Sequence, residues 1–179
     1  MKDTLKECFK RALQEEEKGI KHKGLLITHP NIEEAKRHLQ RAQESLKFCE
    51  VYRKMEADYK IPEEWFYALY YCALAILSKF GVESRSQKYT ALFLQYAQEK
   101  GVIDYDKEFV RRIIVHKEKG IESDVDEREK ARYGSWTKDE SIKEKYEERT
   151  NLCKKAIEQA TTIVFSPQEL KVPEELIKQ

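Results

Sequence analysis

Apolar residues recur at intervals of three and four along most of the chain, the spacing of one face of an α-helix. The clearest series predicts a helix over residues 31–59, roughly 43 Å long at 1.5 Å per residue. Its members form a narrow seam of the kind found in helical bundles, namely Ile32, Ala35, Leu39, Ala42, Leu46 and Cys49. We expect this helix to be the longest of the chain and to need a partner of similar length.

A continuous apolar run over 65–77 predicts the central helix of the bundle. A helix that is apolar on every side must be covered on every side. Pro62 fits its first turn and Gly81 its C-terminal cap. The apolar stretch 25–31 is expected to be a loop, because no partner strand is evident elsewhere.

Shorter periodic segments predict the remaining helices. The first follows Asp3 or Thr4 as its cap, a fourth ends near Gly101 and a fifth near Gly120. A last long helix is expected to open at a capping box of Thr137 and Glu140 and to stop at Ser166-Pro167.

Together these elements predict an all-α fold, an up-and-down bundle of four to five main helices. Residues 1–30 supply an N-terminal helix and loop that pack on the bundle, which spans 31–165. Residues 166–179 form a polar tail that is expected to fray. No strand pair, glycine-rich phosphate loop or internal repeat is apparent.

The charge balance limits the choice of partners. The 179 residues include 34 Lys and Arg against 33 Asp and Glu, so no global basic field attracts nucleic acid. Contact with RNA would require a local patch, or an oligomer that concentrates one.

The four cysteines are far apart in the sequence, and small buried hydrophobes are the favoured interpretation over a metal site or a disulfide framework. They are Cys8, Cys49, Cys72 and Cys153. We expect neither a metal nor another cofactor. No apolar run reaches membrane-spanning length, and the charged N-terminal segment is unlike a signal peptide, so a cytoplasmic protein without a membrane partner is expected.

The segment Arg128-Glu-Lys-Ala-Arg-Tyr-Gly-Ser-Trp136 carries the candidate chemistry. A guanidinium is well suited to grip a phosphate, and a phenol both donates and accepts hydrogen bonds. Two structural interpretations stay open. Arg128 can be a solvated arginine among acidic neighbours, and Tyr133-Gly134 can be a turn in which the tyrosine docks on the bundle.

The order of these segments resembles the HEPN family of prokaryotic helical bundles, in the subgroup whose motif ends in Tyr-Gly. The likeness covers roughly residues 32–164 and rests on the 35–46 seam, the aromatic run from Trp65, the hinge 83–88 and the segment from Arg128 to Gly134. It implies a four- to five-helix bundle that pairs as a homodimer. Many members are metal-independent RNases, and many are encoded beside a small nucleotidyltransferase that can neutralise them.

The resemblance assigns roles to two residues of the motif. Arg128 matches the arginine that holds the scissile phosphate, while Tyr133 stands where the nucleases have histidine. A tyrosine titrates near pH 10 and is a poor base at neutral pH. The hinge also lacks the histidine that the subgroup often carries near Gln87 or Lys88. No other histidine is an evident substitute, whether His22, His29, His38 or His116.

Further cations can join the motif in an anion patch. Arg132 lies four residues after Arg128, on the same face if the stretch is helical. Arg85 and Lys88 of the hinge are additional candidates, with solvated surface charge as the alternative for each.

The resemblance thus implies a HEPN-like homodimeric module that binds RNA or nucleotide phosphate and pairs with a small nucleotidyltransferase. Metal-independent endoribonuclease activity, with Arg128 and Tyr133 as catalytic residues, would be weak or lost, so whether the chain is an enzyme stays open. The alternative is a non-catalytic helical interaction or scaffold protein.

Overall fold

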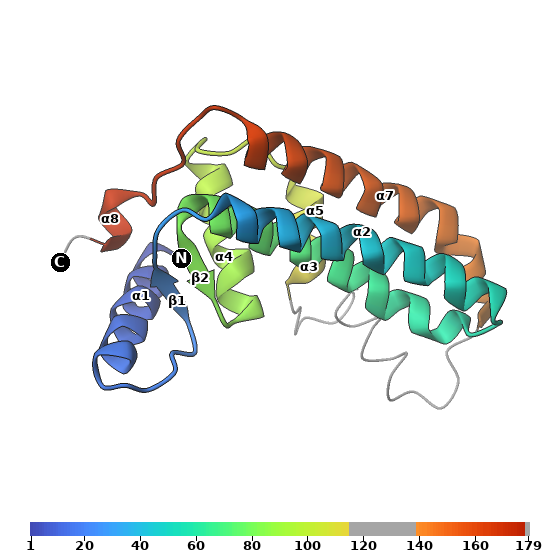
Figure 1. Ribbon diagram of the computed structural model, residues 1–179, viewed down its shortest axis with the longest axis horizontal. Coiled ribbons are helices and arrows are strands. Elements are labelled where there is room, and N and C mark those ends of the chain that lie inside the picture. Colours follow the sequence, from blue (N-terminus) through green and yellow to red (C-terminus); the bar gives the residue numbers. More distant parts are fainter. Residues whose placement is uncertain (115–138, 178–179) are drawn as a thin grey trace.

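Three long helices lie side by side and form the body of the molecule (Figure 1). The computed structural model describes residues 1–114 and 139–177. The three helices are α2 (Ile32–Lys54), α3 (Ile61–Phe80) and α7 (Asp139–Phe165). The shorter α4 (Gln87–Glu99) and α5 (Lys107–Ile113) pack against α3. The all-α prediction is confirmed.

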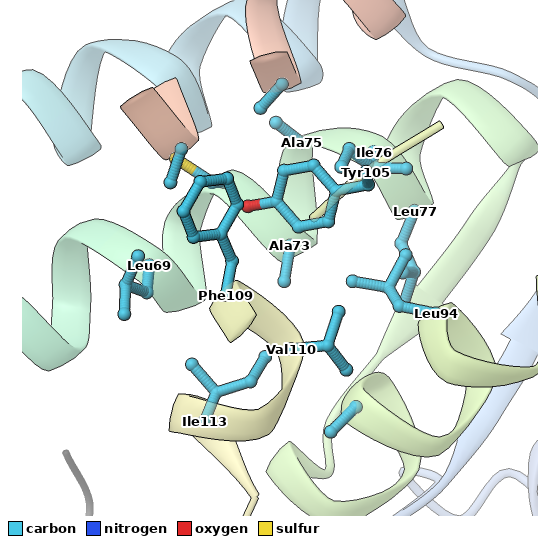
Figure 2. Packing of buried hydrophobic residues seen from close by; sticks show 14 of the residues in the cluster. Leu69, Ala73, Ala75, Ile76, Leu77, Leu94, Tyr105, Phe109, Val110 and Ile113 are labelled. Atoms are coloured by element: carbon cyan, nitrogen blue, oxygen red, sulfur yellow. The ribbon is translucent and has the colours of Figure 1, made fainter. Parts of the chain in front are cut away.

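The apolar run predicted to form the central helix does so. Helix α3 is buried over most of its circumference, with a partly exposed face at Tyr67, Tyr71, Leu74 and Ser78. Side chains of α5 pack against it, with Phe109, Val110 and Ile113 beside Leu69 and Ala73 (Figure 2). Pro62 lies in its first turn, and Gly81 caps its end in the left-handed conformation, at φ 71°. Both predicted signals are confirmed.

The long helix α2 is shorter than predicted. It begins at its cap Asn31 but ends at Lys54, because Glu56 adopts a φ of 55° and a short 3-10 helix, η1 (Asp58–Lys60), follows. With 27 residues against 23, α7 is the longest described helix. From Ala35 to Cys49 the seam of α2 packs on α3 and α7 of the same chain, whereas Ile32 is 36% exposed.

The prediction of a loop over 25–31 is wrong in its first part. β1 (Leu25–Ile27) pairs antiparallel with β2 (Val82–Ser84), with Leu26 opposite Glu83. Each strand has three residues, too few for an alternating pattern to appear in the sequence. The partner strand also overlaps, at Glu83 and Ser84, the segment 83–88 that the sequence indicates as a polar hinge.

The tail packs on the body of the molecule. Helix α8 (Glu174–Ile177) contacts α1 (Lys2–Glu17), and Leu176 is 1% exposed. Glu175 accepts a hydrogen bond from the Tyr96 hydroxyl at 2.9 Å and lies 3.3 Å from the Lys100 ammonium. The expectation of fraying is therefore wrong for these residues. Helix α1 also begins before its predicted caps, at Lys2.

All four cysteines are buried free thiols, as predicted. No helix in the described ranges is long and apolar enough to cross a membrane. The predicted end of the fifth helix at Gly120 is wrong, because α5 ends at Ile113 and Ile114 is extended, at φ −80° and ψ 135°. The capping residue Thr137 lies outside the described residues.

Gly81→Ala is expected to lower the free energy of unfolding by about 2–5 kcal/mol, measured by urea denaturation. An alanine in the left-handed conformation costs about 1–2 kcal/mol, and the steric overlap of its Cβ with neighbouring atoms costs about 1–3 kcal/mol more. A Cβ at Gly81 would lie 2.7 Å from the Thr28 carbonyl oxygen and 2.8 Å from the Pro30 nitrogen. The control is Gly19→Ala, at φ 69° with nothing within 4 Å. Equal losses in the two variants would contradict this account.

Candidate functional site

A cleft of about 970 Å³ opens where α2 begins beside the β1–β2 pair. Most of the side chains that reach into this polar cleft carry charge or an imidazole. They are Lys21, His29, Glu34, His38, Arg41, Glu83 and Arg85. The opposite wall comes from the last turns of α3, at Leu74 and Ser78.

The loop between β1 and α2 is fixed by the end of α3. The Thr28 N–H donates to the Gly81 carbonyl oxygen at 2.7 Å, and the Asn31 N–H donates to the Ser78 carbonyl oxygen at 2.9 Å. The Asn31 side chain in turn accepts from the Glu34 N–H at 2.9 Å, which caps α2. The backbone around the polar cleft is therefore held by main-chain bonds to the core helix.

Arg85 is held in place at both its backbone and its side chain. Its backbone N–H donates to the Gly24 carbonyl oxygen at 3.0 Å, which extends the strand pairing by one step. Its Nε donates to Glu83 Oε1 at 2.7 Å, and His22 Nε2 lies 3.2 Å from the same oxygen. The His22 side chain is fully buried, whereas that of Arg85 is 32% exposed. A guanidinium held through Nε can still offer its terminal N–H groups to an oxyanion.

The carboxylate of Glu83 stays ionised in this arrangement. Partial burial acts to raise its pKa, but the hydrogen bonds and charges of Arg85 and His22 outweigh it, and the pKa is lowered. Glu83 therefore keeps its negative charge and orients Arg85 at neutral pH.

His38 is the most enclosed side chain of those facing the polar cleft from α2. It is 14% exposed, its ring stacks on Tyr71 at a centroid distance of 6.1 Å, and Nε2 lies 3.5 Å from Glu34 Oε1. Burial lowers the pKa of His38, with a smaller opposing effect from Glu34. Glu34 also pairs with Arg37, whose Nη2 lies 2.6 Å from Oε2. At neutral pH the imidazole is thus uncharged.

The lining combines three permanent cations, Lys21, Arg41 and Arg85, with two carboxylates, Glu34 and Glu83. Glu83 pairs with Arg85 of the lining and Glu34 with Arg37 outside it, and the cations of the lining outnumber its carboxylates. This chemistry suits an anion that also carries hydrogen-bond donors. Within the described part of the chain, no group of three or more His, Cys, Asp and Glu side chains is placed to hold a metal ion.

The structure separates the two predicted hinge residues. Arg85 lines the polar cleft, whereas the Lys88 ammonium lies over the Tyr89 ring, 5.6 Å from its centroid. Lys88 is not among the residues of the lining. The other predicted site residues, Arg128, Arg132 and Tyr133, lie outside the described residues.

Most of the lining was not predicted from the sequence. His29 and His38 were considered only as substitutes for the histidine of the nuclease motif and were not selected. One signal was present: Glu34, His38 and Arg41 recur at spacings of four and three, which places them on one face of α2. The pattern was hidden by the stronger apolar seam of the same helix.

Comparison of the chain with protein-family models, with curated proteins and with solved structures finds no match.

His38 is expected to titrate below pH 6.5 in the folded protein, because burial disfavours the charged ring. The unfolded chain then binds the proton more readily than the folded chain. The contribution of His38 to the free energy of unfolding is therefore fully present above about pH 6.5 and is lost as the pH falls below 6.5. NMR titration of the imidazole signals would measure this, with His38→Gln identifying the resonance. A pKa at or above 6.5 would contradict the described burial.

Proposed function

We propose that the chain is a HEPN-like homodimeric module that binds the phosphate of RNA or of a nucleotide in the polar cleft. The observation that carries the proposal is Arg85, which the sequence nominated as a phosphate ligand. Its guanidinium is fixed by Glu83 and the buried His22 at the edge of a cleft that is large enough for a nucleotide. Lys21 and Arg41 in the same lining add charge for an anion.

In this proposal Arg128 and Arg132 supply further phosphate contacts and Tyr133 supplies a hydroxyl, as the resemblance implies. Metal-independent cleavage of RNA would be weak or lost, because tyrosine replaces the histidine of the nuclease motif. The partner would be a small nucleotidyltransferase, and the site of action the cytoplasm.

Arg85→Ala is expected to weaken binding of a fluorescein-labelled RNA oligonucleotide by roughly ten- to 150-fold. A lost charged hydrogen bond is typically worth about 1.5–3 kcal/mol. The melting temperature should change little, since this side chain is partly exposed and makes a surface ion pair. Fluorescence anisotropy measures the binding, and the same samples with EDTA report any metal-independent cleavage.

Lys88→Ala is the matched control, because it removes one cation of the same hinge that lies outside the lining of the cleft. It should leave the affinity within about twofold. If Arg85→Ala behaves like Lys88→Ala, the polar cleft does not bind the phosphate.

A second candidate function, the interaction or scaffold protein, is favoured by an exposed apolar stripe on α2. Phe48, Val51 and Met55 follow one another at spacings of three and four and are 48%, 45% and 68% exposed. Most of the seam of α2 is covered within the chain, whereas this stripe is exposed in the described structure. The stripe is therefore the apolar surface of α2 on which another protein could pack.

If the stripe joins two copies of this chain, light scattering should give a mass of about twice 21.3 kDa, and Val51→Glu should reduce it to that of one chain. The reason is the cost of burying an unpaired carboxylate in an apolar contact. Glu44→Gln, also on α2, serves as the control. A wild-type monomer at micromolar concentration would contradict the homodimer.

A further inference from the structure

We propose that the ligand of the polar cleft is a single-stranded oligonucleotide, one of whose bases stacks on a row of two tyrosines, Tyr71 and Tyr67, beside the cleft. The inference rests on the proposed function and narrows its ligand from any nucleotide phosphate to a strand with unpaired bases.

The tyrosine row continues the wall of the polar cleft along α3. Tyr67, Tyr71, Leu74 and Ser78 follow one another at spacings of four, three and four, so they share one face of the helix. Leu74 and Ser78 line the cleft. At 1.5 Å per residue, Tyr71 and Tyr67 lie roughly 4.5 and 10.5 Å from Leu74 along the helix axis, toward the start of α3. Helix α2, which supplies the other wall, runs beside α3 (Figure 1).

Two side chains connect the tyrosine row directly with the cleft. His38 lines the cleft and stacks on the Tyr71 ring, with an angle of 21° between the planes. Arg41 also lines the cleft, and its guanidinium carbon lies 5.8 Å from the Tyr71 centroid. Tyr67 then stacks on Tyr71 at 5.9 Å and 26°. The rings of His38, Tyr71 and Tyr67 thus form a near-parallel series that starts at the polar cleft, beside Arg41.

Exposure sets these tyrosines apart from the aromatic residues that serve only the core. Trp65 and Phe66, on the same helix, are each 1% exposed, whereas Tyr67 and Tyr71 are only partly buried. Near-parallel, partly exposed rings next to arginine are the arrangement on which bases of single-stranded nucleic acids stack. A phosphate in the cleft would bring the adjoining base to the row, and a ligand without bases would not use it.

The test compares two fluorescein-labelled probes in anisotropy measurements, octauridine RNA and an abasic RNA of the same length. Wild-type protein should bind octauridine more tightly than the abasic strand. Tyr67→Leu and Tyr71→Leu should each weaken octauridine binding by about five- to 150-fold, the usual effect of losing one stacked base, and should leave the abasic strand unaffected. Tyr71→Phe keeps the ring and should keep the affinity.

Tyr59→Leu is the matched control, because Tyr59 is 50% exposed and lies in η1, beyond the far end of α2. It should bind both probes as the wild type does. Equal wild-type affinity for the two probes, or full octauridine binding by a folded Tyr71→Leu variant, would overturn the tyrosine row while leaving the phosphate site intact. No binding of either probe would overturn the proposed function as well. Circular dichroism of each variant confirms that it is folded.

Discussion

The fold depends on one constraint, the need to remove from water a helix that is apolar on every side. Helix α3 carries Trp65, the largest fully buried side chain in the described part of the chain, together with the buried Phe66 and Leu69. Helices α2, α4, α5 and α7 pack around it and cover most of its surface, because an apolar helix is stable only when it is covered. Polar groups of the covering helices support this packing: the Trp65 indole donates to the Thr150 hydroxyl at 3.2 Å, and Lys79 donates to the Val164 carbonyl oxygen near the end of α7.

The polar cleft follows from how α3 ends. The left-handed Gly81 turns the chain back, so that β2 meets β1 and the loop before α2 is held against the last turn of the helix. Polar side chains of three segments, 21–31, 34–41 and 83–85, then face one another across a hollow whose remaining wall includes Leu74 and Val82. The proposed phosphate binding relies on Arg85, which Glu83 orients, and on Lys21 and Arg41 of the same lining.

The bundle could be predicted from the sequence because its signals are local. The period of the seam, the proline at the start of α3 and Gly81 at its end each act within a few residues. The β1–β2 pair could not be found this way, since its partners are far apart in the sequence and too short for a pattern. The packing of the tail depends on isolated apolar residues such as Leu176, whose burial is decided by tertiary contacts.

The same division applies to the site. Arg85 was nominated from the hinge, but the partners that give it a fixed position, Glu83 and His22, come together only through the strand pair. His38 and Arg41 lie on the polar side of an amphipathic helix, and the helix alone does not show which part of that side borders a cavity. Only the packing of α2 beside α3 distinguishes them from solvated surface residues.

The central claim is that phosphate binds between the strand pair and the start of α2. Titration of ¹⁵N-labelled protein with a nucleoside monophosphate, followed by amide chemical shifts, tests it most directly. The account predicts that the largest shifts occur at Thr28, His29, Glu34, His38 and Arg85, which line the polar cleft. Shifts confined to other parts of the chain, with these amides unchanged at saturation, would contradict it.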